Sequence, residues 1–233
     1  MQHIAIILDG NRRWAKQHAL SYGYDYGYKV LKDIIRYIAD NNICPYLTVF
    51  LLSLDNLKRS QLELNTIYNV LHNAALDQDR QLINARFHFI GNKTVFPDYV
   101  LCDMQSIELD SQNKKGLTVN LAMGYSGKWD IRLAAQKIAY DLLNNNITKD
   151  ELRDLTNVDS TLFNRYTSLG SNIPDPDILI RTGNEKRISD FLLWNLSYTE
   201  LFFIAKMWPD FTTNDLTDIL IEYKNRSRKF GIG

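Results

Sequence analysis

The chain has 233 residues, of which 45% are hydrophobic and 23% are charged, and its 27 basic residues balance 27 acidic ones. This composition is that of an ordinary globular protein. The length can bury a full hydrophobic core and is most simply one domain, with two small domains as the alternative. A general nucleic-acid-binding protein would carry an excess of basic residues, so the zero net charge argues against nucleic acid as a partner.

Cysteine usage and the first residues indicate the compartment. Cys44 and Cys102 stand far apart and form no CxxC pair, which favours two packed thiols in a reducing cytosol over disulfides or structural zinc. The apolar run near the N-terminus follows no basic segment and is too short for a signal peptide. No apolar stretch approaches the length of a membrane span. We therefore expect a cytoplasmic protein.

The first predicted element is a buried strand at 4–8, because this run is apolar, rich in β-branched residues and too short for a helix. It stops at Asp9, and Asp9-Gly10-Asn11 has the chemistry of a turn. The segment from Arg12 to Lys16 then has the composition of the first turn of a helix. The sequence therefore begins with a strand, a glycine loop and a helix N-terminus.

Such a strand–loop–helix junction aims unpaired backbone N–H groups at one point, where an anion such as a phosphate can be held. Arg12, Arg13 and Lys16 would add positive charge there, and Asp9 could hold a Mg²⁺ ion that bridges the phosphate. The alternative is an ordinary strand-to-helix turn whose basic residues face solvent. The motif alone leaves both interpretations open.

Strands and helical patterns alternate along the rest of the chain. Leu31, Ile34 and Ile38 recur on one face of a predicted amphipathic helix. This alternation predicts a single α/β domain over residues 1–233, with a central, mostly parallel six-stranded sheet flanked by helices. The predicted strands lie at 4–8, 46–52, 86–90, 117–123, 177–181 and 200–205, and the predicted helices at 27–40, 60–84, 97–110, 128–144 and 212–228.

Three of the predicted strands end in polar loops, and ligands bind beyond the carboxyl ends of the strands in parallel sheets. The loops span residues 53–59, 124–130 and 181–189 and supply arginines, serines and asparagines. Each loop alone could be a capped turn or a rim of surface ion pairs. On the same edge as Asp9, they together suggest a site for a highly charged, phosphorylated ligand.

Several motifs, in order along the chain, carry a resemblance to a known family. They are Asp-Gly-Asn-x-Arg-Trp-Ala near the start, Ser-x-Asp-Asn-x-x-Arg after the second strand, Gly-Leu-Thr-Val-Asn-Leu-Ala and Tyr-Ser-Gly-Lys-Trp-Asp-Ile in mid-chain, and Pro-Asp-Ile-Leu-Ile-Arg-Thr-Gly-Asn-Glu-Lys-Arg-Ile-Ser-Asp-Phe-Leu-Leu-Trp, then Tyr-Thr-Glu-Leu-Phe-Phe and Trp-Pro-Asp-Phe. The set resembles the cis-prenyltransferases, in particular the bacterial undecaprenyl diphosphate synthases, over nearly the whole chain.

The resemblance implies a homodimer with a hydrophobic tunnel beside its parallel sheet. It also implies a Mg²⁺-dependent reaction that condenses isopentenyl diphosphate with an allylic diphosphate and forms Z double bonds. The departing diphosphate needs its charge stabilised by the metal ion and by fixed donors, and the hydrocarbon tail needs an apolar wall. The product would be delivered to the membrane. The enzyme would then be located in the cytoplasm or, as an alternative, bound peripherally at the membrane surface.

The matching residues then have implied roles. Asp9 is the expected Mg²⁺ ligand, with Glu200 as the second metal-binding carboxylate. Asn56, together with Ser53 and Arg59, matches the group implicated in removing the C2 proton of isopentenyl diphosphate. An amide nitrogen is a poor base, so we favour Asn56 as a positioning or relay group, with a diphosphate oxygen or Asp9 receiving the proton.

The implied substrate-binding residues are Gly10, Asn11, Arg12, Arg13, Trp14, Asp55, Arg59, Arg181, Arg187, Ile188 and Ser189. Of these, Gly10 to Arg13 would cradle the allylic diphosphate, and Arg181, Arg187 and Ser189 would bind isopentenyl diphosphate.

The chain departs from the family pattern mainly where the substrates bind. Leu20 and Tyr24 stand in place of an arginine and a histidine in the allylic region, and Lys186 replaces a histidine in the later loop. Leu51 stands where the long-chain pattern has alanine, which predicts a product shorter than undecaprenyl because the larger side chain would obstruct the growing tail. The family's terminal Arg-x-Gly, which reaches a partner's active site, appears as Lys229-Phe230-Gly231.

Two other classes of function stay open. The first is a non-catalytic partner subunit of such an enzyme, which the lost arginine and histidine would allow. Partner subunits of the family lack the Asp-Gly-Asn motif, whereas this chain keeps Asp9, Asn11, Arg13 and Glu200. The second is a phosphate-ligand or nucleic-acid-binding module without chemistry, and the zero net charge argues against its nucleic-acid version.

Overall fold

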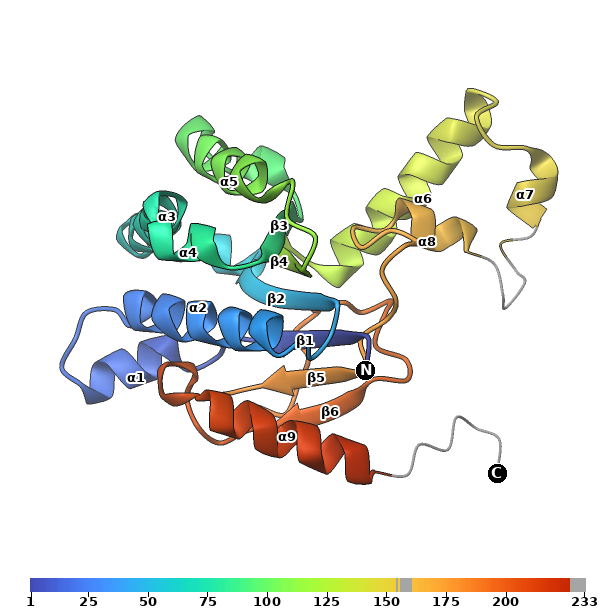
Figure 1. The fold of residues 1–233 in the computed structure, drawn as a ribbon. Helices are drawn as coiled ribbons and strands as arrows, with labels where there is room; N and C mark the ends of the chain where they lie inside the picture. The colour runs from blue at the N-terminus through green and yellow to red at the C-terminus, as the bar shows by residue number, and fades with distance from the viewer. Residues whose placement is uncertain (154, 156–160, 227–233) are drawn as a thin grey trace.

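The six predicted strands form one sheet in the computed structural model, which describes residues 1–153, 155 and 161–226 (Figure 1). The strand order is β3-β4-β2-β1-β5-β6, and every neighbouring pair is parallel. The predicted α/β fold with a mostly parallel sheet is therefore confirmed. The strands are β1 (His3–Ile7), β2 (Tyr46–Ser53), β3 (Ala85–Ile90), β4 (Leu117–Tyr125), β5 (Ile178–Arg181) and β6 (Glu200–Phe203).

Strand β1 lies between β2 and β5, and all five of its residues are buried. Successive side chains of a strand point to opposite faces of its sheet. Ile4 and Ile6 accordingly belong to one hydrophobic cluster, and Ala5 and Ile7 belong to another. Because both faces are covered, the strand is a continuous apolar run rather than an alternating one.

Helices cover the face of the sheet to which Ile4 and Ile6 point. α2, α3, α5 and α9 contribute buried apolar side chains to that cluster, whereas the opposite face is covered largely by loop residues such as Leu169, Phe191 and Leu192. No described helix combines the length and the apolar character needed to cross a bilayer. The helices are α1 (Asn11–Gln17), α2 (Tyr24–Asp40), α3 (Gln61–Leu76), α4 (Gln78–Leu82), α5 (Asp98–Ser111), α6 (Gly127–Leu143), α7 (Lys149–Arg153), α8 (Leu162–Tyr166) and α9 (Thr213–Asn225).

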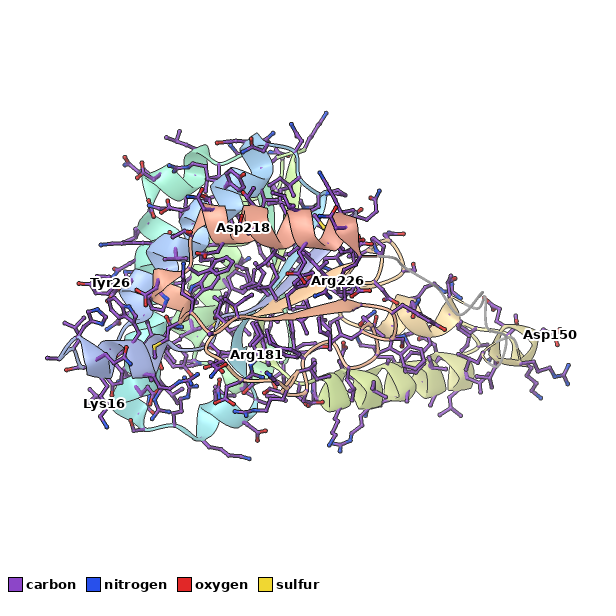
Figure 2. All side chains as sticks on the ribbon, turned by 90° about the horizontal axis from the view of Figure 1, so that it is seen from below. Lys16, Tyr26, Asp150, Arg181, Asp218 and Arg226 are labelled. Atoms are coloured by element: carbon purple, nitrogen blue, oxygen red, sulfur yellow. The ribbon has the colours of Figure 1, made fainter. Side chains whose placement is uncertain are left out.

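Helix α6 extends away from the sheet and carries α7 and α8 beside it (Figure 1). Figure 2 shows the length of this arm, with Asp150 of α7 and Lys16 of α1 at opposite ends of the molecule. A small separate cluster of Ile138, Ile147 and Leu162 joins the arm's elements. The sequence predicted α6 and missed α7 and α8, which are only five residues long each.

The single helix predicted at 60–84 is wrong. The structure ends α3 at Leu76 and begins α4 at Gln78. Between them the backbone of Asp77 is extended, and its carboxylate accepts hydrogen bonds from the N–H groups two and three residues further on. An aspartate in this position starts a new helix because its side chain satisfies N–H groups that the helix itself leaves unpaired.

The ends of two other predicted helices also differ. The helix predicted at 27–40 begins three residues earlier, at Tyr24, so it carries one more turn at its N-terminal end. The helix predicted at 212–228 is α9, which ends at Asn225. Its last predicted residues, 227–228, lie outside the described part of the chain.

Candidate functional site

Asp9, Ser53 and Arg181 meet at the carboxyl edge of the sheet. Ser53 ends β2 and Arg181 ends β5, and both strands flank β1, which Asp9 follows by two residues. Helix α1 follows this turn as predicted and begins at Asn11, one residue before the expected start at Arg12. The edge predicted to hold a ligand thus brings together residues from both ends of the chain.

Two glycines allow the close packing at this edge. Gly10 has a φ of 109°, and a Cβ atom there would lie 2.8 Å from the Cβ of Met207. Gly183 has a φ of 82°, and a Cβ there would lie 2.6 Å from Nη2 of Arg13 and 3.0 Å from the carbonyl carbon of Asp9. Other residues adopt such backbone angles rarely, so each loop needs its glycine to pack closely against its neighbour.

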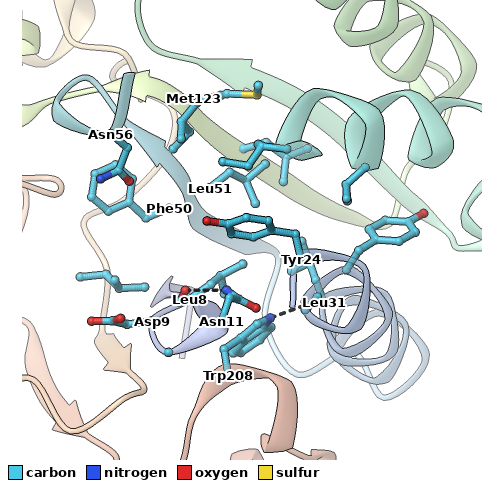
Figure 3. A pocket seen from close by; sticks show the side chains of 18 of the residues that line it. Leu8, Asp9, Asn11, Tyr24, Leu31, Phe50, Leu51, Asn56, Met123 and Trp208 are labelled. Carbon is cyan, nitrogen blue, oxygen red and sulfur yellow. Dashed lines mark hydrogen bonds between the residues drawn. The ribbon is translucent and has the colours of Figure 1, made fainter. Parts of the chain in front are cut away.

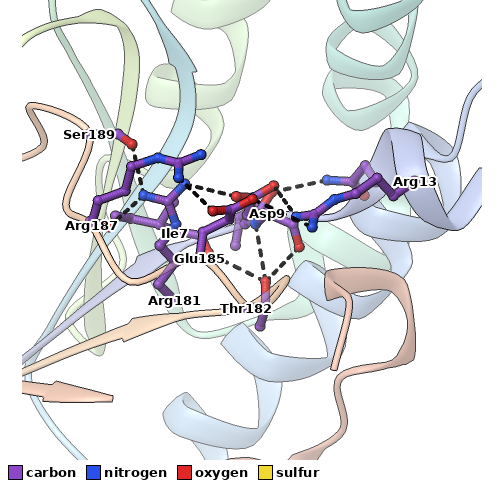
Figure 4. Close-up of polar contacts among 10 residues, drawn as sticks. Ile7, Asp9, Arg13, Arg181, Thr182, Glu185, Arg187 and Ser189 are labelled. Atoms are coloured by element: carbon purple, nitrogen blue, oxygen red, sulfur yellow. Dashed lines mark hydrogen bonds and ion pairs between the residues drawn. The ribbon is translucent and has the colours of Figure 1, made fainter. Parts of the chain in front are cut away.

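Both carboxylate oxygens of Asp9 are paired with arginines (Figure 4). Nη2 of Arg13 lies 3.2 Å from Oδ1, and Nη2 of Arg181 donates to Oδ2 over 2.8 Å. The hydroxyl of Thr182 donates to the backbone carbonyl of Asp9 over 2.8 Å and fixes the loop. The carboxylate therefore stands in fixed geometry between two cations.

Arg181 is the best-held group of the site, because its side chain is only 5% exposed. Its Nη1 donates to the hydroxyl of Ser189 over 2.7 Å and to the carbonyl of Arg187. Its Nε is buried and has no hydrogen-bond partner among the described residues. A buried donor without a partner is costly unless a ligand or a water satisfies it.

A second carboxylate, Glu185, holds the two more exposed arginines. Oε1 of Glu185 lies 3.7 Å from Nη1 of Arg13, and Oε2 pairs with Arg187. The side chains of Arg13 and Arg187 are 45% and 61% exposed, so solvent screens these pairs and each contributes little to stability. A multiply charged anion could therefore replace Glu185 as their partner.

A cavity of about 700 Å³ leads from this edge into the interior, between α2, α3 and the sheet (Figure 3). Asp9, Arg13, Arg181, Arg187 and Ser189 line its charged mouth. The rest of its lining is largely apolar and includes Leu31, Leu51, Ile67, Leu71, Ile107 and Leu121.

Leu51 enters the wall through a bulge in β2. Phe50 pairs with Ala122 and Leu52 pairs with Met123, so Leu51 is an extra residue on its strand. Bulges redirect side chains, and this one lets the consecutive residues Leu51 and Leu52 both pack on the same core cluster. The sequence placed Leu51 beside the site correctly, but the bulge was not predictable from the apolar pattern.

Asn56 and Ser53 are joined at the mouth of the cavity. The N–H of Asn56 donates to the hydroxyl of Ser53 over 3.0 Å, and the N–H of Ser53 approaches Oδ1 of Asn56 at 3.5 Å. Both residues line the cavity, as does Arg59. The amide of Asn56 is therefore held by its own turn and faces the space that the site encloses (Figure 3).

Tyr24 and Glu63 form a buried polar group that the sequence did not reveal. The hydroxyl of Tyr24 donates to Oε1 of Glu63 over 2.6 Å and accepts from Nη1 of Arg59 over 3.0 Å. Burial, reinforced by the hydrogen bond to Glu63, raises the pKa of Tyr24 well above its ordinary value, so its hydroxyl stays protonated. The only available signal was Glu63 three residues after Ser60, as in a capping box. In the structure Ser60 does cap α3, but the Glu63 carboxylate pairs with Arg59 and Arg12.

Four expected site residues are not brought to the cavity. Trp14 is buried, donates to Asp210 over 2.7 Å and stacks on His18, which is a packing role. The exposed Asp55 pairs with Lys58 in solvent, and Ile188 packs against the second core cluster. Glu200 begins β6 at the opposite edge of the sheet and pairs with Arg226 at 2.8 Å. Within one chain, Glu200 cannot share a metal ion with Asp9.

The donor set at the mouth fits Mg²⁺ only together with a substrate. In the described part of the chain no cluster of three histidine, cysteine or acidic side chains could hold a metal ion. Mg²⁺ is commonly bound by one or two carboxylates, several waters and the phosphates of a substrate. Asp9, 27% exposed beside the arginines, could supply such a carboxylate.

Comparison with known proteins places the chain among isoprenyl transferases. The family model of undecaprenyl diphosphate synthase matches residues 7–231. The isoprenyl transferase of Aquifex aeolicus is 37% identical over 99% of this chain and 95% of its own length. A farnesyl-diphosphate-specific ditrans,polycis-undecaprenyl-diphosphate synthase of Buchnera aphidicola is 36% identical over 99% of this chain and 91% of its own. The crystal structure of lavandulyl diphosphate synthase from Lavandula x intermedia, in complex with dimethylallyl diphosphate, is 33% identical and superposes with a TM-score of 0.89 over 99% of this chain and 98% of that one.

Proposed function

The chain belongs to the undecaprenyl diphosphate synthase family and is an isoprenyl transferase, and we propose that its site joins isopentenyl diphosphate to an allylic diphosphate with a Z double bond. One observation carries this proposal: the same cavity combines a mouth of arginines with a largely apolar interior. A substrate with a diphosphate head and a hydrocarbon tail matches both parts. The dimethylallyl diphosphate bound to the lavandulyl diphosphate synthase is a ligand of this kind.

The reaction breaks the C1–O bond of the allylic diphosphate and forms a bond from that carbon to C4 of isopentenyl diphosphate. A proton leaves C2 of the isopentenyl unit, so the new double bond lies between its C2 and C3. We assign the allylic diphosphate to Arg13 and the backbone of residues 10–13. We assign isopentenyl diphosphate to Arg181, Arg187 and Ser189, which already form one hydrogen-bonded group.

Mg²⁺, held by Asp9 and the bound diphosphate, would neutralise the charge of the leaving group. Asn56 is in our proposal a positioning group, because an amide does not accept a proton at neutral pH. The N–H of Ser53, which approaches Oδ1 of Asn56, would hold that amide in its orientation. The departing diphosphate or Asp9 would receive the proton.

Glu200 enters the proposal only through a second copy of the chain, since it lies on the far edge of its own sheet. The remaining parts of the proposal are a homodimer, a cytoplasmic location and release of the product to the membrane. Lys229-Phe230-Gly231, expected to reach a partner's site, lies outside the described residues.

The direct test incubates the purified chain with labelled isopentenyl diphosphate, Mg²⁺ and a panel of allylic diphosphates. We expect an extractable product that carries the label and disappears on addition of EDTA. Mass spectrometry after dephosphorylation gives the chain length, and NMR gives the double-bond geometry. Binding of both substrates without any product would favour the non-catalytic partner subunit. No binding of either would overturn the proposal.

A further inference from the structure

A group of polar side chains lies at the inner end of the cavity, far from the diphosphate site. Tyr28, Lys32 and Arg80 line the same cavity as Asp9. Tyr28 and Lys32 stand one and two turns beyond Tyr24 on α2, and Arg80 belongs to α4. Charged side chains in the wall of a hydrocarbon cavity are unexpected, since they present nothing favourable to an alkyl tail.

The pairing register of the sheet gives the depth of this end. The guanidinium of Arg80 stacks on Phe87, 5.6 Å from the ring centre. Phe87 is level with Val119, which is level with Leu47 and, one strand further, with Ile4. Ile4 precedes Asp9 by five residues, or roughly 16 Å along the strand direction. The polar group therefore lies toward the opposite edge of the sheet from the diphosphate site.

Each member of the group is tied to a partner. Nζ of Lys32 lies 2.8 Å from Oδ2 of Asp77, and the hydroxyl of Tyr28 donates to the same oxygen over 2.7 Å. Burial opposes the charge of Asp77, but the hydrogen bonds from Lys32 and Tyr28 outweigh it and lower the pKa of Asp77 to about 2. Only 17% of the Lys32 side chain and 18% of the Asp77 side chain are exposed.

Arg80 connects α4 to the C-terminal end of α3 and to α5. Its Nε donates to the carbonyl of Ala74 over 2.7 Å, and its Nη2 donates to the carbonyl of Ala75 and pairs with Asp110 of α5 at 3.2 Å. The Arg80 side chain is 5% exposed. An alkyl tail that pushed past it would leave buried carbonyls and charges unpaired, which is strongly unfavourable.

We propose that Tyr28, Lys32, Asp77 and Arg80 form a polar floor that stops the growing hydrocarbon chain and so limits product length. The inference rests on the proposed function for its substrate.

The test replaces the floor and reads product length by mass spectrometry. Lys32→Ala removes a charge and opens space, while Asp77 keeps its bonds from Tyr28 and from the N–H groups of α4. Arg80→Leu removes the other charge. We expect the ratio of longer to wild-type-length product to rise on the order of tenfold, about 1.4 kcal/mol. Lys29→Ala, on the exposed side of the same helix, is the matched control and should leave the ratio unchanged.

A binding series separates this inference from the proposed function. Unreactive thiodiphosphates with tails of one to four isoprene units are titrated calorimetrically. In the wild type, affinity should rise with tail length and then fall once the tail reaches the floor, and Lys32→Ala should move the fall to a longer tail. If the protein makes no product but shows this dependence of affinity on tail length, the polar floor is supported and the proposed condensation reaction is not. If an active Lys32→Ala variant makes products of wild-type length and its binding series is unshifted, the proposed polar floor is refuted. If Arg80→Leu does not fold, the Lys32→Ala variant alone is sufficient for this test.

Discussion

The Nη2 of Arg181 donates to Oδ2 of Asp9 over 2.8 Å, so the expected metal ligand and an expected substrate-binding arginine are each other's partners. Arg13 takes the other oxygen of the same carboxylate. A metal ion on Asp9 and a diphosphate on the arginines would exchange these contacts for stronger ones. Both carboxylate oxygens of Asp9 are thus engaged by arginines, and we expect a bound diphosphate to draw the arginines away and free the carboxylate for the metal.

Asp9 is the first residue to test. Asp9→Ala should lower turnover roughly 10³-fold, about 4 kcal/mol in the transition state, because the charge on the leaving diphosphate loses its metal. Steady-state kinetics with saturating substrates measures this loss. Asp9→Asn keeps an oxygen acceptor for Arg181 and should fold while remaining nearly inactive. A variant of Asp9 that keeps most of its turnover would contradict the mechanism.

Arg187 distinguishes the two diphosphate sites. Arg187→Ala should raise the KM for isopentenyl diphosphate about tenfold or more and change the KM for the allylic substrate much less, since charged contacts to a phosphate act locally. Arg187 is exposed, so the fold should survive. Lys186→Ala changes an exposed neighbour outside the cavity lining and serves as the control. Equal effects on both substrates would mean that this loop is wrongly assigned.

Leu51 tests the width of the cavity rather than its depth. Leu51→Ala removes about three non-hydrogen atoms from the wall near the mouth, and the tail then passes with less strain, which we expect to be worth roughly 1–3 kcal/mol. The prediction is that the wild type makes a product shorter than undecaprenyl and that this variant makes longer ones. Mass spectrometry of dephosphorylated products decides it. A wild-type product of undecaprenyl length, unchanged by the substitution, would refute the role of Leu51.

Tyr24 should matter for stability through Glu63. Tyr24→Phe removes a hydrogen bond to a carboxylate whose side chain is 8% exposed, and the buried acceptor then keeps one partner fewer. The free energy of unfolding should fall by about 1–3 kcal/mol, measured by urea denaturation. Tyr26→Phe, on the exposed side of α2 where Tyr26 packs against Trp14, should change stability by less than half as much. Equal effects would show that the Tyr24 hydroxyl is not specifically important.

His3 predicts how stability depends on pH. Burial lowers the pKa of His3 from 6.5 to about 4. Its Nδ1 faces the carbonyl of Pro174 at 2.6 Å, so Nδ1 carries the hydrogen and Nε2 accepts from the Thr48 hydroxyl at 2.7 Å. The unfolded chain therefore binds a proton between pH 6.5 and 4 that the folded chain does not. The stability from His3 is complete above pH 6.5 and is lost as pH falls toward 4, by about 3 kcal/mol in total.

Chemical denaturation at several pH values between 4 and 7 checks this slope. In His3→Gln the contribution from this residue should vanish, which leaves a flatter curve whatever the other groups do. A variant with the wild-type slope would show that His3 is protonated equally in the folded and unfolded chains. The substitution lies far from the cavity mouth, so it tests the fold without touching the reacting groups.

The sheet was predictable from sequence because its strands are short apolar runs with β-branched residues, and residues following them were predicted to share an edge. That logic brought Asp9, Ser53 and Arg181 together correctly. Applied to Glu200, the same logic would have placed this residue at the other edge of the sheet, away from Asp9. Glu200 opens its predicted strand whereas Asp9 closes one, and parallel strands place these positions at opposite edges.

What could not be predicted depends on contacts between elements. The break at Asp77 lies inside a stretch of good helix formers, and its cause is a carboxylate that caps the next helix and meets Lys32 from α2. The pairing of Tyr24 with Glu63 likewise needs two helices to be in place. Helical periodicity reports which side of one helix is apolar, but not which polar groups of two helices will meet.

The side chains of Tyr24 and Tyr28 connect α2 to the opposite wall of the cavity, which α3 and α4 form, through hydrogen bonds of their hydroxyls. They lie one helical turn apart on the same side of α2, and one ends on Glu63 of α3 while the other ends on Asp77 at the junction with α4. A hollow lined by leucine and isoleucine would gain contacts by collapsing. Because a phenol ring is rigid, these two contacts hold the walls of the cavity apart when nothing is bound. In the proposed function, the hydrocarbon tail would therefore enter a space that is already open.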